Sequence, residues 1–200
     1  MRLVVDGWAE DPEASRQKAI AFAQRALGAA TDDPVVLANA AYTLAYFGED
    51  MATMTGLADQ ALALNPSYAR GWFVSGILRL FAGQPDLAIE HVERSLRLSP
   101  RGYPGLTPMT VIGMAHLLSR RFELAAQNLR LGLRQTPDWP SPYRYLAACY
   151  AHLGRLDEAR ASIEQLRVMG APMVPRQAFP NRELHELLIS GLRLATGEDT

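Results

Sequence analysis

Residues 143–166 read YRYLAACYAHLGRLDEARASIEQL, which has the pattern of two short helices joined by a turn at Gly154. Small residues at Ala147 and Ala159 allow two antiparallel helices to approach closely, and bulky residues such as Tyr143 fill the space beside them. This stretch therefore predicts a helical hairpin.

The same pattern recurs along the chain with a period near 34 residues. Pro66 and Pro100 each end an apolar helix and lie 34 residues apart. The repeat between them has a bulky wedge residue and then small residues, at Trp72, Gly76, Ala88 and Ser95. Pro137 follows 37 residues after Pro100, which predicts a three-residue insertion within residues 101–105. A period of this length with paired helices is typical of one class of solenoid.

The pattern predicts an all-α fold, a right-handed superhelical solenoid of antiparallel helix hairpins, with no strand. Start signals occur at Asp11-Pro12, Asp33-Pro34, Gln84-Pro85 and Pro180-Asn181. We expect helices near residues 12–29, 35–47, 50–64, 69–82, 85–98, 107–119, 122–135, 141–153, 156–169 and 181–194.

The chain is expected to divide into three parts. Residues 1–34 are an N-terminal partial repeat or cap, residues 35–169 are an array of about four repeats, and residues 170–200 are a C-terminal linker and capping helix. The helix at 12–29 has the pattern of the second helix of a hairpin. Two interpretations stay open: the chain begins inside an array, or residues 1–8 fold back as an irregular cap.

The repeats resemble the tetratricopeptide repeat family over about residues 35–169. The whole chain also resembles the repeat region that follows the catalytic domain of bacterial class III adenylate/guanylate cyclases. The segments that carry this second resemblance are GWAEDPEAS, DDPVVLANAAYTLAYFG, ALALNPSYARGW, AIEHVERSLRLSP and ELHELLISGLRLA. It implies a regulatory or interaction-bearing region, with the catalytic domain elsewhere in the parent protein.

Bulk composition argues against several classes of partner. The net charge is −1 and the isoelectric point is near 6.4, so the broad positive field of a nucleic-acid-binding protein is not expected. The sequence has no long apolar run, and we expect no membrane partner. A single cysteine, Cys149, cannot form an internal disulfide. These features favour a cytoplasmic location.

Catalytic and metal-binding patterns are not found in the sequence, so we expect no enzyme activity, no metal and no cofactor. The histidines are more than twenty residues apart, at His91, His116, His152 and His185. The acidic pair Asp157-Glu158 opens a helix, where it complements the dipole, and Glu198-Asp199 lies in a tail. Cys149 is expected to be a buried small hydrophobe rather than a catalytic thiol. We expect no cyclase turnover from this chain alone.

Binding is expected on a concave groove lined by the first helix of each hairpin. The predicted partner-binding residues are Tyr42, Tyr46, Arg70, Phe73, Ile77, Leu80, Thr110, Met114, Leu117, Arg144 and His152. The alternative for each is packing against a following helix or a neighbouring molecule. The basic cluster Arg120, Arg121, Arg130 and Arg134 is interpreted as a solvated convex face, with a patch for an acidic partner as the alternative.

The leading hypothesis is a protein-interaction module that binds a peptide, a helix or a second copy of itself. The resemblance to cyclases places it in the regulatory region of a signalling protein. Two alternatives belong to other classes: a stand-alone receptor or enzyme that uses the groove for a small ligand, and a purely structural dimerisation module.

Overall fold

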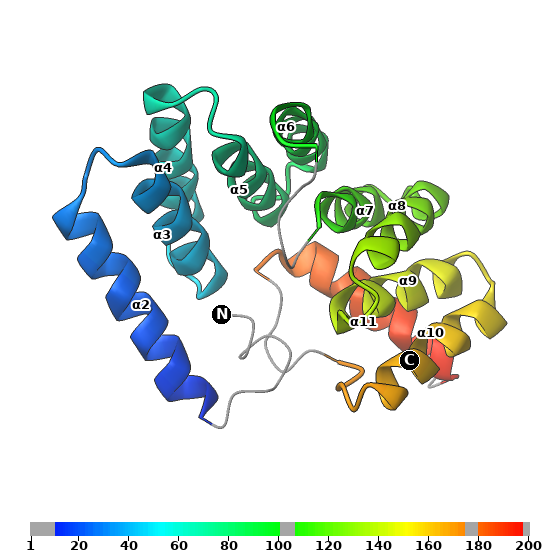
Figure 1. Cartoon of the computed structure of the whole chain (residues 1–200). Helices are drawn as coiled ribbons and strands as arrows, with labels where there is room; N and C mark the ends of the chain where they lie inside the picture. Colours follow the sequence, from blue (N-terminus) through cyan, green and yellow to red (C-terminus); the bar gives the residue numbers. More distant parts are fainter. Residues whose placement is uncertain (1–10, 101–106, 175–179, 198–200) are drawn as a thin grey trace. The chain divides into compact units, whose positions relative to one another are not determined.

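The computed structural model describes residues 11–100, 107–174 and 180–197, and all regular structure in these ranges is helical. The described residues form two compact units (Figure 1). Unit 1, residues 11–100, contains α2 (Pro12–Ala29), α3 (Pro34–Tyr46), α4 (Met51–Leu64), α5 (Ala69–Phe81) and α6 (Pro85–Leu98). Unit 2, residues 107–174 and 180–197, contains α7 (Pro108–Leu118), α8 (Phe122–Gln135), α9 (Pro140–His152), α10 (Leu156–Val168) and α11 (Arg182–Thr196).

The predicted all-α fold is confirmed, and each predicted helix is found within two residues of its expected bounds. The predicted insertion at residues 101–105 and the two interpretations of residues 1–8 lie outside the described residues. Within the described ranges, no helix is both long enough and apolar enough to cross a membrane.

Helix starts follow from the capping residues. Asp33 accepts hydrogen bonds from the backbone N–H groups of Val35 and Val36 at 2.7 and 3.2 Å, and Pro34 occupies the first helical position. These bonds satisfy donors that have no partner inside the helix. Side-chain caps of the same kind begin four other helices, at Asp11, Asp50, Thr107 and Asn181.

The four hairpin turns share one backbone conformation. The second residue after the first helix has a positive φ in each, at Gly48, Gly83, Arg120 and Gly154. The next N–H donates back to a carbonyl in the last turn of the first helix, as from Arg121 to His116 at 2.9 Å. Glycine adopts this left-handed conformation without steric cost. Arg120 is the only described residue other than glycine that does so.

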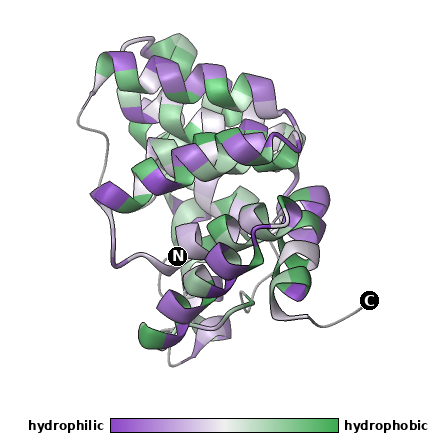
Figure 2. Cartoon of the chain, turned by 90° about the vertical axis from the view of Figure 1, so that its right-hand side faces the viewer, coloured by the Kyte–Doolittle hydropathy of each residue, from purple (hydrophilic) through white to green (hydrophobic). Residues whose placement is uncertain are grey.

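Small residues bring the two helices of a hairpin together. A Cβ added to Gly76 of α5 would lie 2.6 Å from Cγ2 of Val92 and 3.0 Å from the carbonyl oxygen of Ala88. Gly113 of α7 has the same relation to Leu129 and Ala125 of α8. This confirms the register predicted for the small positions. Figure 2 shows hydrophobic and hydrophilic residues alternating along individual helices, as expected where one face is buried.

Candidate functional site

All predicted partner-binding residues lie on the first helices α3, α5, α7 and α9, but most of them are buried in this structure. Tyr42, Arg70 and His152 are half-buried. The buried ones are Tyr46, Phe73, Ile77, Leu80, Thr110, Met114, Leu117 and Arg144. For these eight, the burial is as expected from the alternative in which the side chain packs against a following helix.

In unit 1, aromatic side chains join the first helices α3 and α5. Tyr42 and Tyr46 of α3 both approach Phe81 of α5, with ring centroids 6.4 and 6.2 Å apart. Nearer the beginning of the same two helices, Nε of Arg70 in α5 donates a hydrogen bond of 3.2 Å to Oδ1 of Asn39 in α3. The first-helix face of unit 1 is therefore defined here by these five residues, which combine an aromatic cluster with a cation.

Tyr42 is a neutral phenol on this face. Its removal from water raises its pKa to about 12, although the positive charge of Arg70 acts in the opposite direction. The hydroxyl group can therefore donate or accept a hydrogen bond throughout the neutral pH range. Together with Arg70, Tyr42 gives the face two half-buried groups that can make polar contacts.

In unit 2, Thr110 belongs to the contact between α7 and α8. Its Oγ1 lies 2.9 Å from Oγ1 of Thr107, and a Cβ added to Gly132 of α8 would lie 2.5 Å from the same Thr110 atom. The hydroxyl group of Thr110 is thus directed at a close helix crossing. Its position in the first helix did not reveal this, because the small residue that makes the crossing close lies on α8.

Three residues of α9 form a stripe along one side of this helix: Arg144, Ala148 and His152, spaced four residues apart. We call them the α9 stripe. Nε of Arg144 donates a hydrogen bond of 2.9 Å to the carbonyl oxygen of Pro172. Nε2 of His152 lies 2.9 Å from the carbonyl oxygen of Leu187. A carbonyl can only accept, so this nitrogen carries the hydrogen.

Helix α11 packs against α9 (Figure 1), where it contacts Ala148 and His152 of the α9 stripe. A Cβ added to Gly191 of α11 would lie 2.6 Å from both Cα and Cβ of Ala148, so the two helices cross there with almost no space between their backbones. Next to the crossing, the ring of His152 stacks on Phe122 of α8 with centroids 4.8 Å apart. The apolar face of α11 is buried at Leu184, Leu187, Leu188, Leu192 and Ala195.

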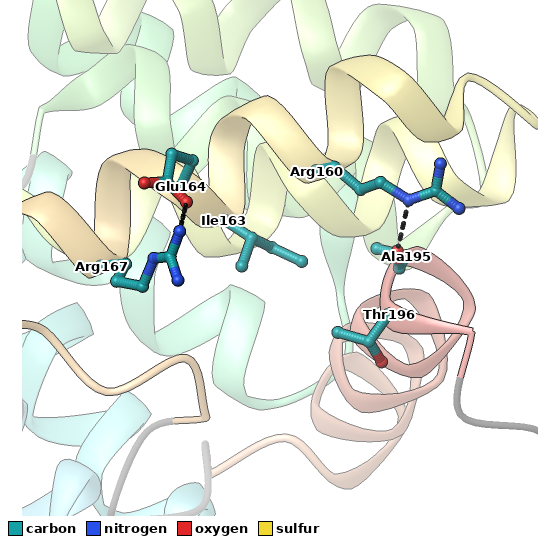
Figure 3. A pocket seen from close by; sticks show the side chains of 6 residues that line it. All are labelled: Arg160, Ile163, Glu164, Arg167, Ala195 and Thr196. Carbon is teal, nitrogen blue, oxygen red and sulfur yellow. Dashed lines mark hydrogen bonds and ion pairs between the residues drawn. The ribbon is translucent and has the colours of Figure 1, made fainter.

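A small pocket lies where α10 meets the end of α11 (Figure 3). Its volume is about 360 Å³, and its lining is Arg160, Ile163, Glu164, Arg167, Ala195 and Thr196. Nε of Arg160 donates to the carbonyl oxygen of Ala195 at 3.3 Å, and Arg167 pairs with Glu164 at 2.6 Å. Both guanidinium groups thus have partners within the protein, and both side chains are more than half exposed.

The outer face of α10 is more polar than the equivalent face of α8. Ala126 of α8 is 3% exposed, and the residue 34 positions later is Arg160, whose side chain is 58% exposed. Leu133 and Arg167 are related in the same way. Polar outer faces are typical of the terminal repeats of solenoids.

Other residues considered from the sequence have structural roles. Cys149 is fully buried, which confirms the predicted small core residue, and this burial raises the pKa of its thiol to about 12. Glu158, in the first turn of α10, is paired with Arg155, and their hydrogen bond lowers the pKa of the Glu158 carboxyl group. In the described ranges, no three His, Cys, Asp or Glu side chains form a metal-binding group.

The basic cluster is exposed at Arg120, Arg121, Arg130 and Arg134, as a solvated face would be. Glu198-Asp199 lies outside the described residues.

The residues that complete these two faces were not predicted from the sequence. Phe81, which unites the aromatic cluster, is the last residue of α5, and Asn39 was not expected to contact Arg70. Ala148 and Gly191 were missed because a small residue marks a close helix contact without naming the partner helix. The signal for α11 was its own pattern, in which leucines surround Gly191 on one face.

Comparison with solved structures agrees with the fold. A tetratricopeptide repeat protein from Parabacteroides merdae ATCC 43184 superimposes with a TM-score of 0.66 and 17% sequence identity, covering 93% of this chain and 68% of that one. MamA from Desulfovibrio magneticus RS-1 gives a TM-score of 0.57 at 18% identity, covering 79% of this chain and 85% of that one. At this level of identity the likeness concerns the fold, which is a tetratricopeptide-type array of hairpins.

One curated protein is similar in sequence. The cytochrome c-type biogenesis protein CycH of Rhizobium meliloti (strain 1021) is 30% identical over 145 residues, which are 70% of this chain. The chain spans only 37% of the length of that relative. No protein-family model matches the chain.

Proposed function

We propose that this chain is a protein-interaction module whose binding surfaces are the first-helix faces of its hairpins. The observation that carries the proposal is the contact between α9 and α11, in which the amphipathic helix α11 packs against the α9 stripe. A first-helix surface of this protein therefore has the shape and chemistry to bind a helix. The likeness in fold to a tetratricopeptide repeat protein supports the same role.

The first-helix face of unit 1 is the proposed contact surface for a partner protein. Aromatic and arginine side chains are enriched among the residues that dominate binding energy in protein interfaces. Tyr42 and Arg70 are only half-buried, so a partner can reach them. Phe73 and Ile77 are only 4% and 2% exposed, which makes them unsuitable for testing partner contact.

Two kinds of parent protein are candidates for the module. The 30% sequence identity with CycH favours a scaffold in the assembly of c-type cytochromes, because that relative is described as a biogenesis protein. The segments quoted above for the cyclase resemblance favour the regulatory region of a cytoplasmic cyclase-like signalling protein. The sequence of the complete parent gene distinguishes these two, since only a cyclase carries a nucleotide-cyclising catalytic domain.

A small-ligand receptor is the weaker alternative. The pocket between α10 and α11 is its best candidate site, but the two arginines that line the pocket are already engaged by Glu164 and by the carbonyl oxygen of Ala195. The polar contacts that a ligand could make with these exposed arginines would themselves contribute little to binding.

Site-specific photocrosslinking tests the proposal. A photoreactive amino acid at position 42 should capture a partner from lysate of the source cells, whereas the same group at position 97, an exposed residue of α6, should not. The captured protein is then purified and titrated by calorimetry. We expect Arg70→Ala to weaken binding by about 30-fold, or about 2 kcal/mol, and Arg97→Ala to leave it unchanged.

Three outcomes of this experiment count against the proposed surface. The first is equal capture at positions 42 and 97, and the second is a partner that responds to Arg97→Ala but not to Arg70→Ala. The third is unchanged affinity in both variants. Circular dichroism on each variant establishes that the helices are intact before binding is compared.

A further inference from the structure

The geometry points to a helix-binding site on unit 2 that α11 of the same chain occupies. When α11 is released, an amphipathic helix of a partner protein with the same residue pattern binds to this site. This inference rests on the proposed function and specifies one of its surfaces and the chemistry of the ligand. The site consists of the α9 stripe together with the adjoining side of α7, which α11 also contacts.

The crossing at Ala148 sets the first requirement for a ligand. Gly191 leaves no room for a side chain, because the atoms it would strike include Cα and the carbonyl oxygen of Ala148, at 2.6 and 2.9 Å. Backbone atoms of α9 cannot move aside as the end of a flexible side chain can. A helix that occupies this site must therefore have a very small residue at the crossing.

The neighbours of the crossing set the second requirement. Leu184, Leu188 and Leu192 of α11 follow one another at intervals of four residues and are at most 1% exposed. A helix with leucines at this spacing presents a continuous apolar face. The partner helix therefore needs three such leucines, with the small residue directly before the third.

His152 adds a polar anchor. Its Nε2–H donates to the carbonyl oxygen of Leu187, and Oγ of Ser190 lies 3.4 Å from the same nitrogen. The acceptor is the backbone carbonyl of Leu187, and every helix has such carbonyl groups. Ser190 also hydrogen-bonds to that carbonyl at 3.1 Å. The anchor thus adds a polar contact without demanding a particular side chain of the ligand.

Residues 169–181 connect α10 to α11, so α11 competes with any partner from within the chain. A tethered segment acts at an effective concentration on the order of millimolar. A free helix of similar affinity is therefore excluded at micromolar concentration while α11 is bound. The connection makes the site selective for partners that bind more tightly than α11 or that bind after α11 has been released.

The test uses a fluorescent peptide with the sequence of residues 181–197 and the full chain as the receptor. Gly191→Val in the chain should release α11 through the clash with Ala148 and leave the α9 stripe unchanged. Leu194→Val is the matched control, because Leu194 is 51% exposed on the outer face of α11. A second peptide carries valine in place of Gly191.

We expect the wild-type chain and Leu194→Val to show little binding of the peptide at about 100 µM, because the tethered α11 occupies the site. The Gly191→Val chain should bind it at least about tenfold more tightly in fluorescence anisotropy. The peptide with valine at the crossing should not bind to any of the three chains. This result would show that the site binds a helix and requires a small residue of that helix opposite Ala148.

A second variant covers the case in which Gly191→Val unfolds unit 2. Leu187→Ala removes a buried side chain of α11 without introducing a clash. Hydrogen exchange should then show faster exchange in residues 182–196 and unchanged protection in α7 to α10, with peptide affinity between those of the wild-type and Gly191→Val chains. Loss of protection in all helices of unit 2 would show that α11 is a structural part of the core, and the inference would be wrong.

Light scattering identifies the occupant. The wild-type chain should have the mass of a single copy, 22.0 kDa. A dimer that Gly191→Val converts to a monomer would show that α11 exchanges between two copies, which contradicts a partner helix as the ligand. If the Gly191→Val chain keeps its helices but does not bind the peptide, the helix site is refuted, while capture at position 42 still tests the proposed function of unit 1.

Discussion

The two units fill their first-helix faces in different ways. In unit 1, side chains of the array itself meet across α3 and α5, where Tyr42 and Tyr46 approach Phe81. In unit 2, the α9 stripe is built around Ala148, and a separate helix fills the space. Large residues on a first helix thus fill its face with their own side chains, whereas a small residue allows another helix to pack closely against it.

The strongest test of this contrast is Leu188→Ala in α11. Leu188 is fully buried, and loss of such a side chain costs about 2 to 5 kcal/mol because a cavity remains. We expect Leu129→Ala, in the core between α7 and α8, to cost a similar amount. Urea denaturation measures both variants, and a cost near zero for Leu188→Ala would mean that α11 does not seal unit 2.

The next test asks whether the hairpins of the two units are equivalent beneath these faces. Ala88→Leu in unit 1 and Ala125→Leu in unit 2 overpack the same register position, since both alanines are fully buried. Each should cost about 1 to 3 kcal/mol. The exposed neighbours Glu90→Ala and Gln127→Ala should stay within about 0.5 kcal/mol. Similar melting temperatures for a buried variant and its exposed control would show that the repeat register is wrong.

Alkaline pH should weaken unit 1 through Tyr42. Its pKa is raised from 10.0 to about 12 in the folded protein, so between these values the unfolded chain loses the proton first. The contribution of the neutral Tyr42 phenol to the free energy of unfolding is therefore fully present below pH 10. It falls as pH rises toward 12, by at most about 2.7 kcal/mol. Tyr42→Phe should remove this part of the pH dependence in urea titrations. An identical decline in the variant would contradict the assignment to Tyr42.

The smallest expected effect is a gain in stability at the α7–α8 turn. Arg120 has a φ of 56° where the equivalent turns have glycine, and a side chain in this conformation costs about 1 kcal/mol. Arg120→Gly should therefore stabilise unit 2 by about 0.5 to 1 kcal/mol. Arg121→Gly, one residue later at a negative φ, should bring no gain. Equal changes in urea denaturation would indicate that Arg120 is not strained.

The sequence was sufficient to predict the helices because their ends are locally encoded. Pro34 and Asp33 specify a helix start through fixed dihedrals and a side-chain cap, whatever the rest of the chain does. The close contact of Gly76 with Ala88 could also be predicted, because both belong to one hairpin with a known period.

The arrangement of α11 could not be predicted in this way. The leucines around Gly191 show that one face is buried, but amphipathic periodicity does not identify the surface that covers it. For the same reason Arg144 and His152 were assigned to a groove without showing that their contacts include Pro172 and Leu187 of the same chain. Such pairings depend on the path of the connecting segment, which local patterns do not encode.

The packing of α11 against α9 affects the order in which unit 2 folds. Contacts within and between neighbouring hairpins join residues that are close in sequence, so α7 to α10 can fold while the chain is still being synthesised. The bond from His152 to Leu187 closes a separation of 35 residues and must wait until α11 has been made. During that interval the side of α9 that α11 covers is exposed to other nascent chains. The emergence of α11 from the ribosome therefore ends the period in which unit 2 is most prone to misassociation.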